Sequence, residues 1–153
     1  MEEMMTIDGV VYSVDLTSEW KEQPQSDPDR AIFEAKNMDS GLFISSINIV
    51  SDIEEIKRVA EKLKEVRLTG EQEAARHYSR TVTITKTELK RRDWGYSLSY
   101  EGHDSSGRKF LYSDVVTPEL ILNISIEGYD ISWGKLRREF EKILATRHFN
   151  KSF

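Results

Sequence analysis

The residues best suited to chemistry in this chain are its three histidines, His77, His103 and His148. His103 is followed directly by Asp104, and a histidine beside a carboxylate can act as a general base that its neighbour orients. The pair falls in a predicted hairpin turn, where adjacent residues usually point apart. We therefore expect both to be surface turn residues. An enzyme or small-ligand protein that uses the His103-Asp104 hairpin is kept as the alternative function.

The sequence lacks the residue patterns expected of metal-binding and phosphate-binding sites. The chain has no cysteine, which removes disulfides, thiolate metal sites and a cysteine nucleophile. No second histidine lies at metal-ligand helical spacing from His77 or His148, so a metal site would need ligands from distant segments. Gly95, Gly102 and Gly107 form no phosphate-binding motif, and neither GxSxG nor HExxH occurs. The sequence therefore predicts no cofactor, no metal site and no catalytic residue.

The charge balance argues against nucleic acid as the partner. The 153 residues include 27 acidic and 22 basic side chains, for a net charge of −5, whereas phosphate binding depends on clustered positive charge. The basic run Lys90-Arg91-Arg92 precedes Trp94 and Tyr96, a combination that can bind single-stranded nucleic acid. In an acidic chain, a run this short is better interpreted as a solvated hairpin turn. The net negative charge favours either a basic protein partner or simple solubility.

Small polar side chains recur at one phase of the predicted strands. If the large residues of each strand face the core, the short polar ones gather on the opposite face. Such a face is either simply solvated or a platform that receives a protein partner through hydroxyl and amide hydrogen bonds. Ser99 and Ser125 in particular are expected to point away from the main core. The candidate partner-binding residues are Ser97, Ser99, Asn123, Ser125, Thr83, Thr85, Thr87, Ser46 and Asn48.

A predicted meander of three antiparallel strands positions most of these candidates. The first strand, 94–101, and the third, 120–127, alternate large apolar residues with smaller or polar ones, which is typical of half-buried strands. The second strand runs from about 109 to 116, between a turn at 103–107 and the break Thr117-Pro118-Glu119. The large residues at one phase are Trp94, Tyr96, Leu98 and Tyr100 in the first strand and Leu120, Leu122, Ile124 and Ile126 in the third.

Four further strands are predicted, over 9–16, 30–36, 42–50 and 81–88. Thr17 to Trp20 could form one helical turn, with Trp20 as an apolar plug. The segment 21–30 is polar, contains two prolines and is predicted to be a loop. Residues 1–8 and 149–153 are expected to fray.

The helical spacing of apolar residues predicts two long helices and one short helix. Ser51 followed three residues later by Glu54 is a capping box, which opens a helix over about 52–67. Gly70 is expected to end it, and a shorter helix over 71–78 follows. The last helix, about 131–145, has Asp130 as its candidate N-cap. Its apolar face consists of Trp133, Leu136, Phe140, Ile143 and Leu144.

These elements predict one α+β domain over residues 1–153. Its antiparallel sheet contains the C-terminal three-strand meander and packs with a central helix and a C-terminal helix. The helices could cover one face of the sheet or opposite faces, and periodicity does not decide between the two.

The order of elements from Tyr12 to Phe149 resembles the PsbP-like and Mog-type α/β sandwich group. The likeness is carried by YSVDLTSEW, by LFISSINI leading into the long helix, and by Tyr100-Glu101-Gly102 followed by Gly107-Arg108. ELILNISIEG and the helix beginning near Trp133 complete it. The group includes DcrB-like proteins and the Eag chaperones of bacterial type VI secretion, which this chain resembles most in length. The resemblance implies a mostly non-enzymatic module that binds photosystem subunits, a Ran-type GTPase or secreted effectors.

The function implied by this resemblance is a non-catalytic protein-binding module for a secreted bacterial effector or toxin. It would act as an Eag-like type VI effector chaperone or as a cognate immunity protein. A chaperone for apolar segments should expose an apolar concave face, and an immunity protein a more acidic, polar one. The N-terminus has no signal-peptide pattern and no apolar run reaches about 18 residues, so we expect a cytoplasmic protein without membrane insertion. The mature form of an exported protein would have the same pattern. A homodimer is compatible with the sequence.

Overall fold

The computed structural model describes residues 4–8, 12–27, 29–35, 39–129 and 133–149. The strands are β1 (Met4–Asp8), β2 (Tyr12–Thr17), β3 (Lys21–Gln23), β4 (Arg30–Ala35), β5 (Ser40–Asn48), β6 (Val82–Arg92), β7 (Gly95–Asp104), β8 (Arg108–Val116), β9 (Leu120–Tyr129) and β10 (His148–Phe149). The helices are α1 (Ile56–His77) and α2 (Trp133–Thr146). The α+β class predicted from the sequence is confirmed.

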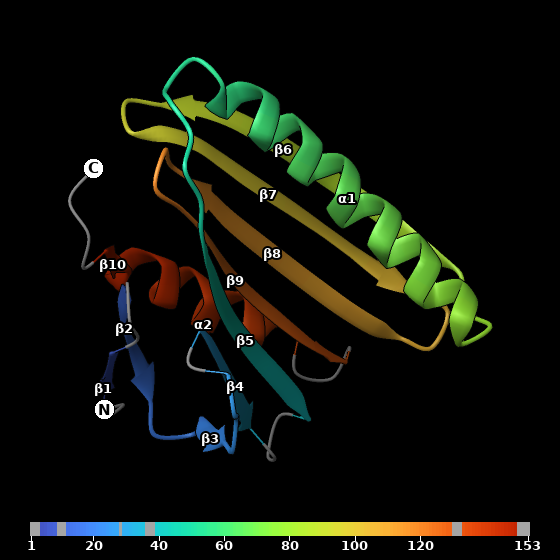
Figure 1. Cartoon of the computed structure of the whole chain (residues 1–153). Coiled ribbons are helices and arrows are strands. Elements are labelled where there is room, and N and C mark those ends of the chain that lie inside the picture. The colour runs from blue at the N-terminus through green and yellow to red at the C-terminus, as the bar shows by residue number, and fades with distance from the viewer. Residues whose placement is uncertain (1–3, 9–11, 28, 36–38, 130–132, 150–153) are drawn as a thin grey trace.

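The described strands form two antiparallel sheets (Figure 1). The larger has the order β3-β4-β5-β9-β8-β7-β6, so the predicted meander is present as β7-β8-β9, and β5 pairs with its outer strand. The smaller sheet has the order β1-β2-β10. Neighbouring strands in the meander are joined by short turns, as antiparallel pairing allows.

The two helices lie on opposite faces of the larger sheet, which settles what periodicity left open. Adjacent residues of β8 alternate between the faces: Phe110 packs in a cluster with Ala75 of α1, and Leu111 packs in another with Leu136 of α2. Figure 1 shows α1 running along β6, β7 and β8. The larger sheet is therefore a middle layer, with α1 on one face and α2 on the other.

The α2 side holds the larger core. Leu122, Ile124 and Ile126 of β9 are fully buried there, as the strand phase predicts. All five predicted apolar residues of α2 pack in this core, with Leu136, Phe140 and Ile143 buried. Trp20 is 1% exposed, so its predicted role as an apolar plug is confirmed. Strand β2 packs on α2 and closes this layer.

A β-bulge preserves the apolar phase on the α1 side. The pairing of β6 with β7 shifts between Ile84 and Lys86, so Thr85 is an extra residue in the ladder. Because of the shift, Ile84 before the bulge and Leu89 after it both pack against the α1-side cluster of Leu98 and Phe110. Without the extra residue, the two would point to opposite faces.

Helix α1 differs from its prediction at both ends and in the middle. It is continuous from Ile56 to His77, so the break expected at Gly70 is wrong. Nothing lies within 4 Å of the position of a Cβ at Gly70, so this residue only lowers the intrinsic helix propensity. The capping box is also replaced: Asp52 Oδ1, not Ser51, accepts hydrogen bonds from the backbone N–H groups of Glu54 and Glu55.

Several segments predicted to be irregular are strands. Residues 4–8 form β1, 21–23 form β3, and 148–149 form β10 against β2. Pairing with a neighbouring strand, which local composition does not report, orders each of them.

The basic run ending at Arg92 lies within β6 and not in the turn. Trp94 sits in that turn and packs in the α2-side core, on the opposite side from Tyr96. The predictions for Asp130, residues 1–3 and residues 150–153 lie outside the described residues.

Candidate functional site

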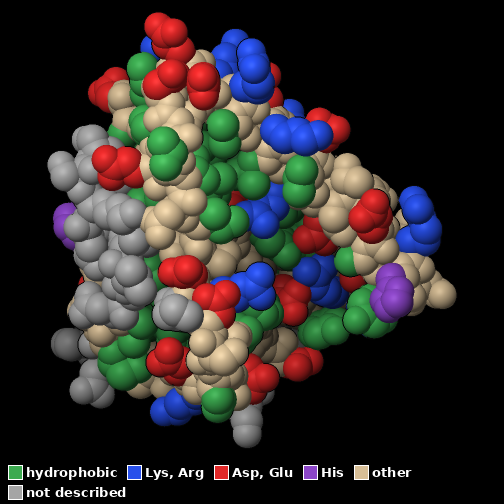
Figure 2. All heavy atoms as spheres, viewed as in Figure 1, with side chains coloured by type: hydrophobic (Ala, Val, Ile, Leu, Met, Phe, Trp, Pro, Cys, Tyr) green, Lys and Arg blue, Asp and Glu red, His purple; other side chains and the backbone are tan. Residues whose placement is uncertain are grey.

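A hollow lined by ion-paired side chains lies on the α1 face of the larger sheet, beside α1. The helix packs on β6, β7 and β8, and β5 and β4 continue the same face beyond it (Figure 1). Strand pairing places Phe43 and Ser45 of β5 and Asn123, Ser125 and Glu127 of β9 on this face. We call this strip of sheet between α1 and β4 the channel. Figure 2 shows the hollow beside α1, with acidic and basic side chains next to each other inside it.

A buried ion pair links α1 to the middle of the channel. Arg67 Nη2 donates a hydrogen bond of 2.9 Å to Asp114 Oδ1, and Arg67 Nε donates one of 3.3 Å to Oδ2. The amide of Asn123 donates to the same Oδ1 at 3.0 Å. The Asp114 side chain is fully buried. Burial raises the pKa of Asp114, and the Arg67 charge and the two side-chain donors oppose that rise.

Arg108 is the centre of a second network, further along the channel. Its Nε lies 2.5 Å from Glu127 Oε2, and its Nη1 lies 3.7 Å from Glu71 Oε2 and 4.0 Å from Asp104 Oδ2. The guanidinium also lies over the Phe110 ring, 4.6 Å from its centroid. These contacts join β8, β9, α1 and the end of β7 through one side chain. A guanidinium held in this way keeps a fixed position.

Two stacked tyrosines fill the space between these networks. The rings of Tyr100 and Tyr112 are 4.5 Å apart at an interplanar angle of 7°. Tyr112 and Glu71 both line the space beside Arg108, between α1 and β8. Burial, followed by nearby negative charge, raises the pKa of both phenols, so both remain neutral at ordinary pH. The tyrosines therefore act as packing for the channel wall.

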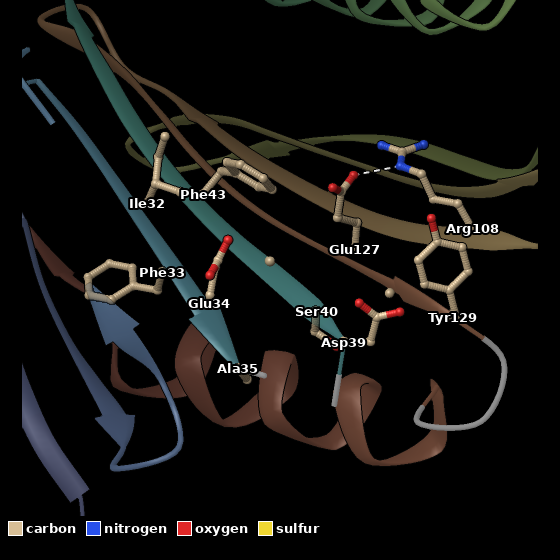
Figure 3. Close-up of a pocket in the computed structure, with 12 residues that line it drawn as sticks. Ile32, Phe33, Glu34, Ala35, Asp39, Ser40, Phe43, Arg108, Glu127 and Tyr129 are labelled. Atoms are coloured by element: carbon tan, nitrogen blue, oxygen red, sulfur yellow. Dashed lines mark hydrogen bonds and ion pairs between the residues drawn. The ribbon is translucent and has the colours of Figure 1, made fainter. Parts of the chain in front are cut away.

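A pocket of about 450 Å³ lies at the Arg108 end of the channel. Figure 3 shows Glu127 directed at Arg108, with Glu34, Asp39 and Tyr129 around the opening and Phe43 and Ile32 on the β4–β5 side. Three carboxylates and one guanidinium line it, which leaves a local formal charge of −2. A second pocket of about 250 Å³ lies between α1 and β8, on the other side of Arg108. It is lined by Glu71, Ala74, Ala75, Tyr78, Arg80, Val82, Asp104, Arg108 and Tyr112.

The predicted partner-binding residues lie on two faces of the larger sheet and not on one. Ser99 pairs with Ser113, which pairs with Ile124, so these residues share the α2 face. Ser125 pairs with Tyr112, which pairs with Tyr100, so it lies on the α1 face. The phase of β9 relative to β7 is therefore opposite to the one assumed from the sequence.

The remaining candidates divide in the same way. Strand pairing places Ser46, Asn48, Thr83 and Ser97 on the α2 face, and Asn123 and Thr87 on the α1 face. Thr85 is the bulged residue. Ser46, Asn123 and Ser125 are buried, and Ser99, Thr83, Thr85 and Asn48 are exposed. A single platform containing all of them does not exist, although Asn123 and Ser125 belong to the channel floor.

His103 and Asp104 do not form a base-and-orienter pair. Pairing of His103 with Thr83 and of Asp104 with Val82 places their side chains on opposite faces of β7. Asp104 instead holds its own turn, because its Oδ1 accepts hydrogen bonds from the backbone N–H of Ser106 at 2.8 Å and from the Ser106 hydroxyl. Within the described ranges, no group of three His, Asp or Glu residues is arranged to hold a metal ion.

Sequence reasoning missed the charged residues of the channel, although two of them carried a signal. Arg67 follows Leu63 by four residues, which places it on the sheet-facing stripe of α1. Asp114 lies inside the apolar strand β8, between Ser113 and Val115. A charged residue at a core phase predicts a buried partner of opposite charge. Nothing local to Arg108 or Glu127 indicates that they pair.

Comparison with known proteins yields structural likeness alone. The chain matches no protein-family model and no curated protein. It is similar to the solution structure of cyanobacterial PsbP (CyanoP) from Synechocystis, with a TM-score of 0.70 and 11% identity, covering 97% of this chain and 94% of that one. A crystal structure from Bacteroides thetaiotaomicron matches with a TM-score of 0.50 and 14% identity, covering 99% of this chain and 49% of that one.

The likeness to cyanobacterial PsbP confirms the PsbP-like part of the resemblance at the level of fold. The nearer relation to DcrB-like and Eag-type proteins remains a prediction. In the part of the chain that the structure describes, no helix is long and apolar enough to cross a membrane.

Proposed function

We propose that this chain is a non-catalytic protein-binding module that receives its partner in the channel. The observation that carries the proposal is the channel itself, a sheet face that extends beyond α1 and is lined by ion-paired, oriented side chains. Arg67 and Arg108 are each held by carboxylates, and Asn123 and Ser125 of the floor are 5% and 4% exposed. Arginine and aromatic side chains in fixed positions are typical of protein interfaces.

The partner class proposed from the sequence is a secreted bacterial effector or toxin, and the channel favours an immunity role over a chaperone role. The pocket at the end of the channel carries a charge of −2 from Glu34, Asp39, Glu127 and Arg108, and Glu34 and Asp39 are exposed. A long apolar segment laid over this end would remove water from those two carboxylates without replacing the lost hydrogen bonds. A folded toxin domain with its own polar groups suits this surface better.

The test is recovery of partners from the native host with a matched pair of variants. Ser45→Arg places a long cation in the channel floor, because Ser45 pairs with Arg30 and Asn123 on the α1 face. Thr83→Arg adds the same side chain at an exposed position on the α2 face. We expect wild type and Thr83→Arg to retain the partner, and Ser45→Arg to lose it at an unchanged melting temperature. A partner retained equally by all three proteins would remove the channel as its binding surface.

Growth assays separate the two roles once the partner is identified. In the immunity role, expression of the partner alone stops growth, and co-expression with wild type, but not with Ser45→Arg, restores it. In the chaperone role, the partner is degraded or aggregates without this chain and causes no growth arrest. The second result would leave protein binding in place and overturn the immunity role.

A further inference from the structure

The channel is amphipathic along its length. At one end, Ile47 of β5 is 56% exposed and pairs with Ile121, which packs in one cluster with Val59 of α1. Val66 is 53% exposed and lies seven residues after Val59, so it occupies the same flank of α1. This end therefore presents apolar side chains to solvent from both the helix and the sheet.

The other end is acidic. Glu34 and Asp39 are exposed at the pocket opening, and Glu127 lies within it. The positive charge of Arg108 is offset by Glu127, Glu71 and Asp104, the last of which also lies 3.9 Å from Arg80. Lys21 pairs with Glu34 on the same face, so this end holds five carboxylates against two guanidiniums and one ammonium group. The balance of charge attracts cations and repels anionic groups.

The two ends are separated by the length of β5. Ile47 and Gly41 are six residues apart on this strand, which corresponds to about 20 Å in an extended chain. A partner segment in the channel would span this distance with about six extended residues or about 13 helical ones. Its side chains would meet apolar groups at one end and carboxylates at the other.

We propose that the channel receives an amphipathic segment of a partner protein, with apolar side chains against Ile47 and Val66 and a lysine or arginine at the acidic pocket. The cationic group of that residue lies among Glu34, Asp39 and Glu127, and its aliphatic stem lies along Phe43. The proposal rests on the proposed protein-binding function and specifies the chemistry of the partner. Charge complementarity excludes an acidic segment, because its carboxylates would face three carboxylates and one guanidinium that is already paired with Glu127.

Photo-crosslinking in the native host tests this placement directly. A benzoylphenylalanine is introduced in the full chain at Ile47, at Glu34, or at Thr83 as the control on the α2 face. We expect adducts from positions 47 and 34, and not from 83, to map to one segment of one partner. That segment should have apolar residues at the first site and a lysine or arginine beside the second. Adducts that map to an acidic or uncharged stretch at position 34, or adducts from position 83 alone, would overturn the proposal.

A charge-reversal pair separates this proposal from the proposed function. Glu34→Lys reverses one exposed charge of the pocket, and Glu22→Lys makes the same change on exposed strand β3, where pairing with Phe33 places it on the α2 side. We expect Glu34→Lys to weaken retention of the partner by about tenfold or more, and Glu22→Lys by less than about twofold. If Ser45→Arg abolishes binding and Glu34→Lys does not, the channel binds a partner but the basic occupant is wrong.

Discussion

The guanidinium of Arg67, on α1, makes a bidentate pair with the carboxylate of Asp114, on β8, with N···O distances of 2.9 and 3.3 Å. The carboxylate is fully buried, and the guanidinium is 28% exposed. The pair therefore fixes the helix to the sheet at the middle of the channel. Removal of either partner would leave a charge in a site where water cannot replace the lost contact.

The first prediction concerns this pair. Arg67→Met should lower the free energy of unfolding by about 3–5 kcal/mol, because Asp114 would remain buried without its counter-charge. The double variant Arg67→Met/Asp114→Asn should recover part of that loss. Urea denaturation of Arg67→Met, Asp114→Asn and the double variant gives the coupling free energy between the two side chains. Lys62→Met breaks an exposed pair with Glu65 and should cost less than about 1 kcal/mol. Equal losses for Arg67→Met and Lys62→Met would contradict the assignment.

Arginine substitutions at two serines should have opposite outcomes. Ser99 is exposed on the α2 face of β7, so Ser99→Arg should change the free energy of unfolding by less than about 0.5 kcal/mol. Ser125 is 4% exposed between Phe43 and Tyr112, so Ser125→Arg should prevent folding or lower the melting temperature strongly. Thermal unfolding by circular dichroism measures both. A stable Ser125→Arg protein would show that the channel floor opens to solvent.

Truncations on β9 test the α2-side core. Leu122 and Ile124 are both fully buried, so Leu122→Ala or Ile124→Ala should cost about 2–5 kcal/mol in the free energy of unfolding. Ile47→Ala, at a position that is 56% exposed, is the matched control and should cost much less. Chemical denaturation with a common slope for all variants provides the comparison. Similar costs at positions 47 and 124 would contradict the described burial.

Asp104 should contribute to the pH dependence of stability. Burial raises its pKa, but hydrogen bonds from Ser106 and the Arg108 charge outweigh burial and hold the pKa below its ordinary value. A carboxyl group with a lowered pKa in the folded state stabilises the fold above its unfolded-state pKa. This contribution is lost as the pH falls through the folded-state pKa.

The corresponding measurement is the urea midpoint of wild type and Asp104→Asn across acid and neutral pH. The difference between the two should be greatest at neutral pH and should shrink as the solution is acidified. Ser106→Ala removes one of the donors and should give a smaller difference of the same sign. A difference that grows on acidification would mean that the pKa is raised instead.

The sequence by itself determined the strands of the meander, the C-terminal helix, the first half of α1 and the α+β class. The phase of the apolar residues within each strand also followed from it, because alternation of side chains is a local property of an extended chain. Strand alternation and helical spacing are therefore enough to identify Leu122, Ile124, Leu136 and Phe140 as core residues. The plug at Trp20 is recognisable in a similar way, as a large apolar residue next to a polar loop.

Only the tertiary structure decided how those phases combine. Relative phase between strands depends on the pairing register, which the turns and the Thr85 bulge set. As a result, Tyr100 of β7 and Ser125 of β9 face α1 together, whereas sequence alternation had grouped Ser125 with Ser99. Gly70 likewise remained helical because tertiary contacts override a weak local preference.

The channel is likewise a feature that only the tertiary structure decided. Arg108 and Glu127 are 19 residues apart, and Arg67 and Asp114 are 47 apart. Each pair meets because β8 lies between β7 and β9 and because α1 crosses above β8. Periodicity reports which side of its own element a residue occupies, and it carries no information about which distant side chain lies opposite. That information comes from sheet order and helix placement, which depend on packing of the whole chain.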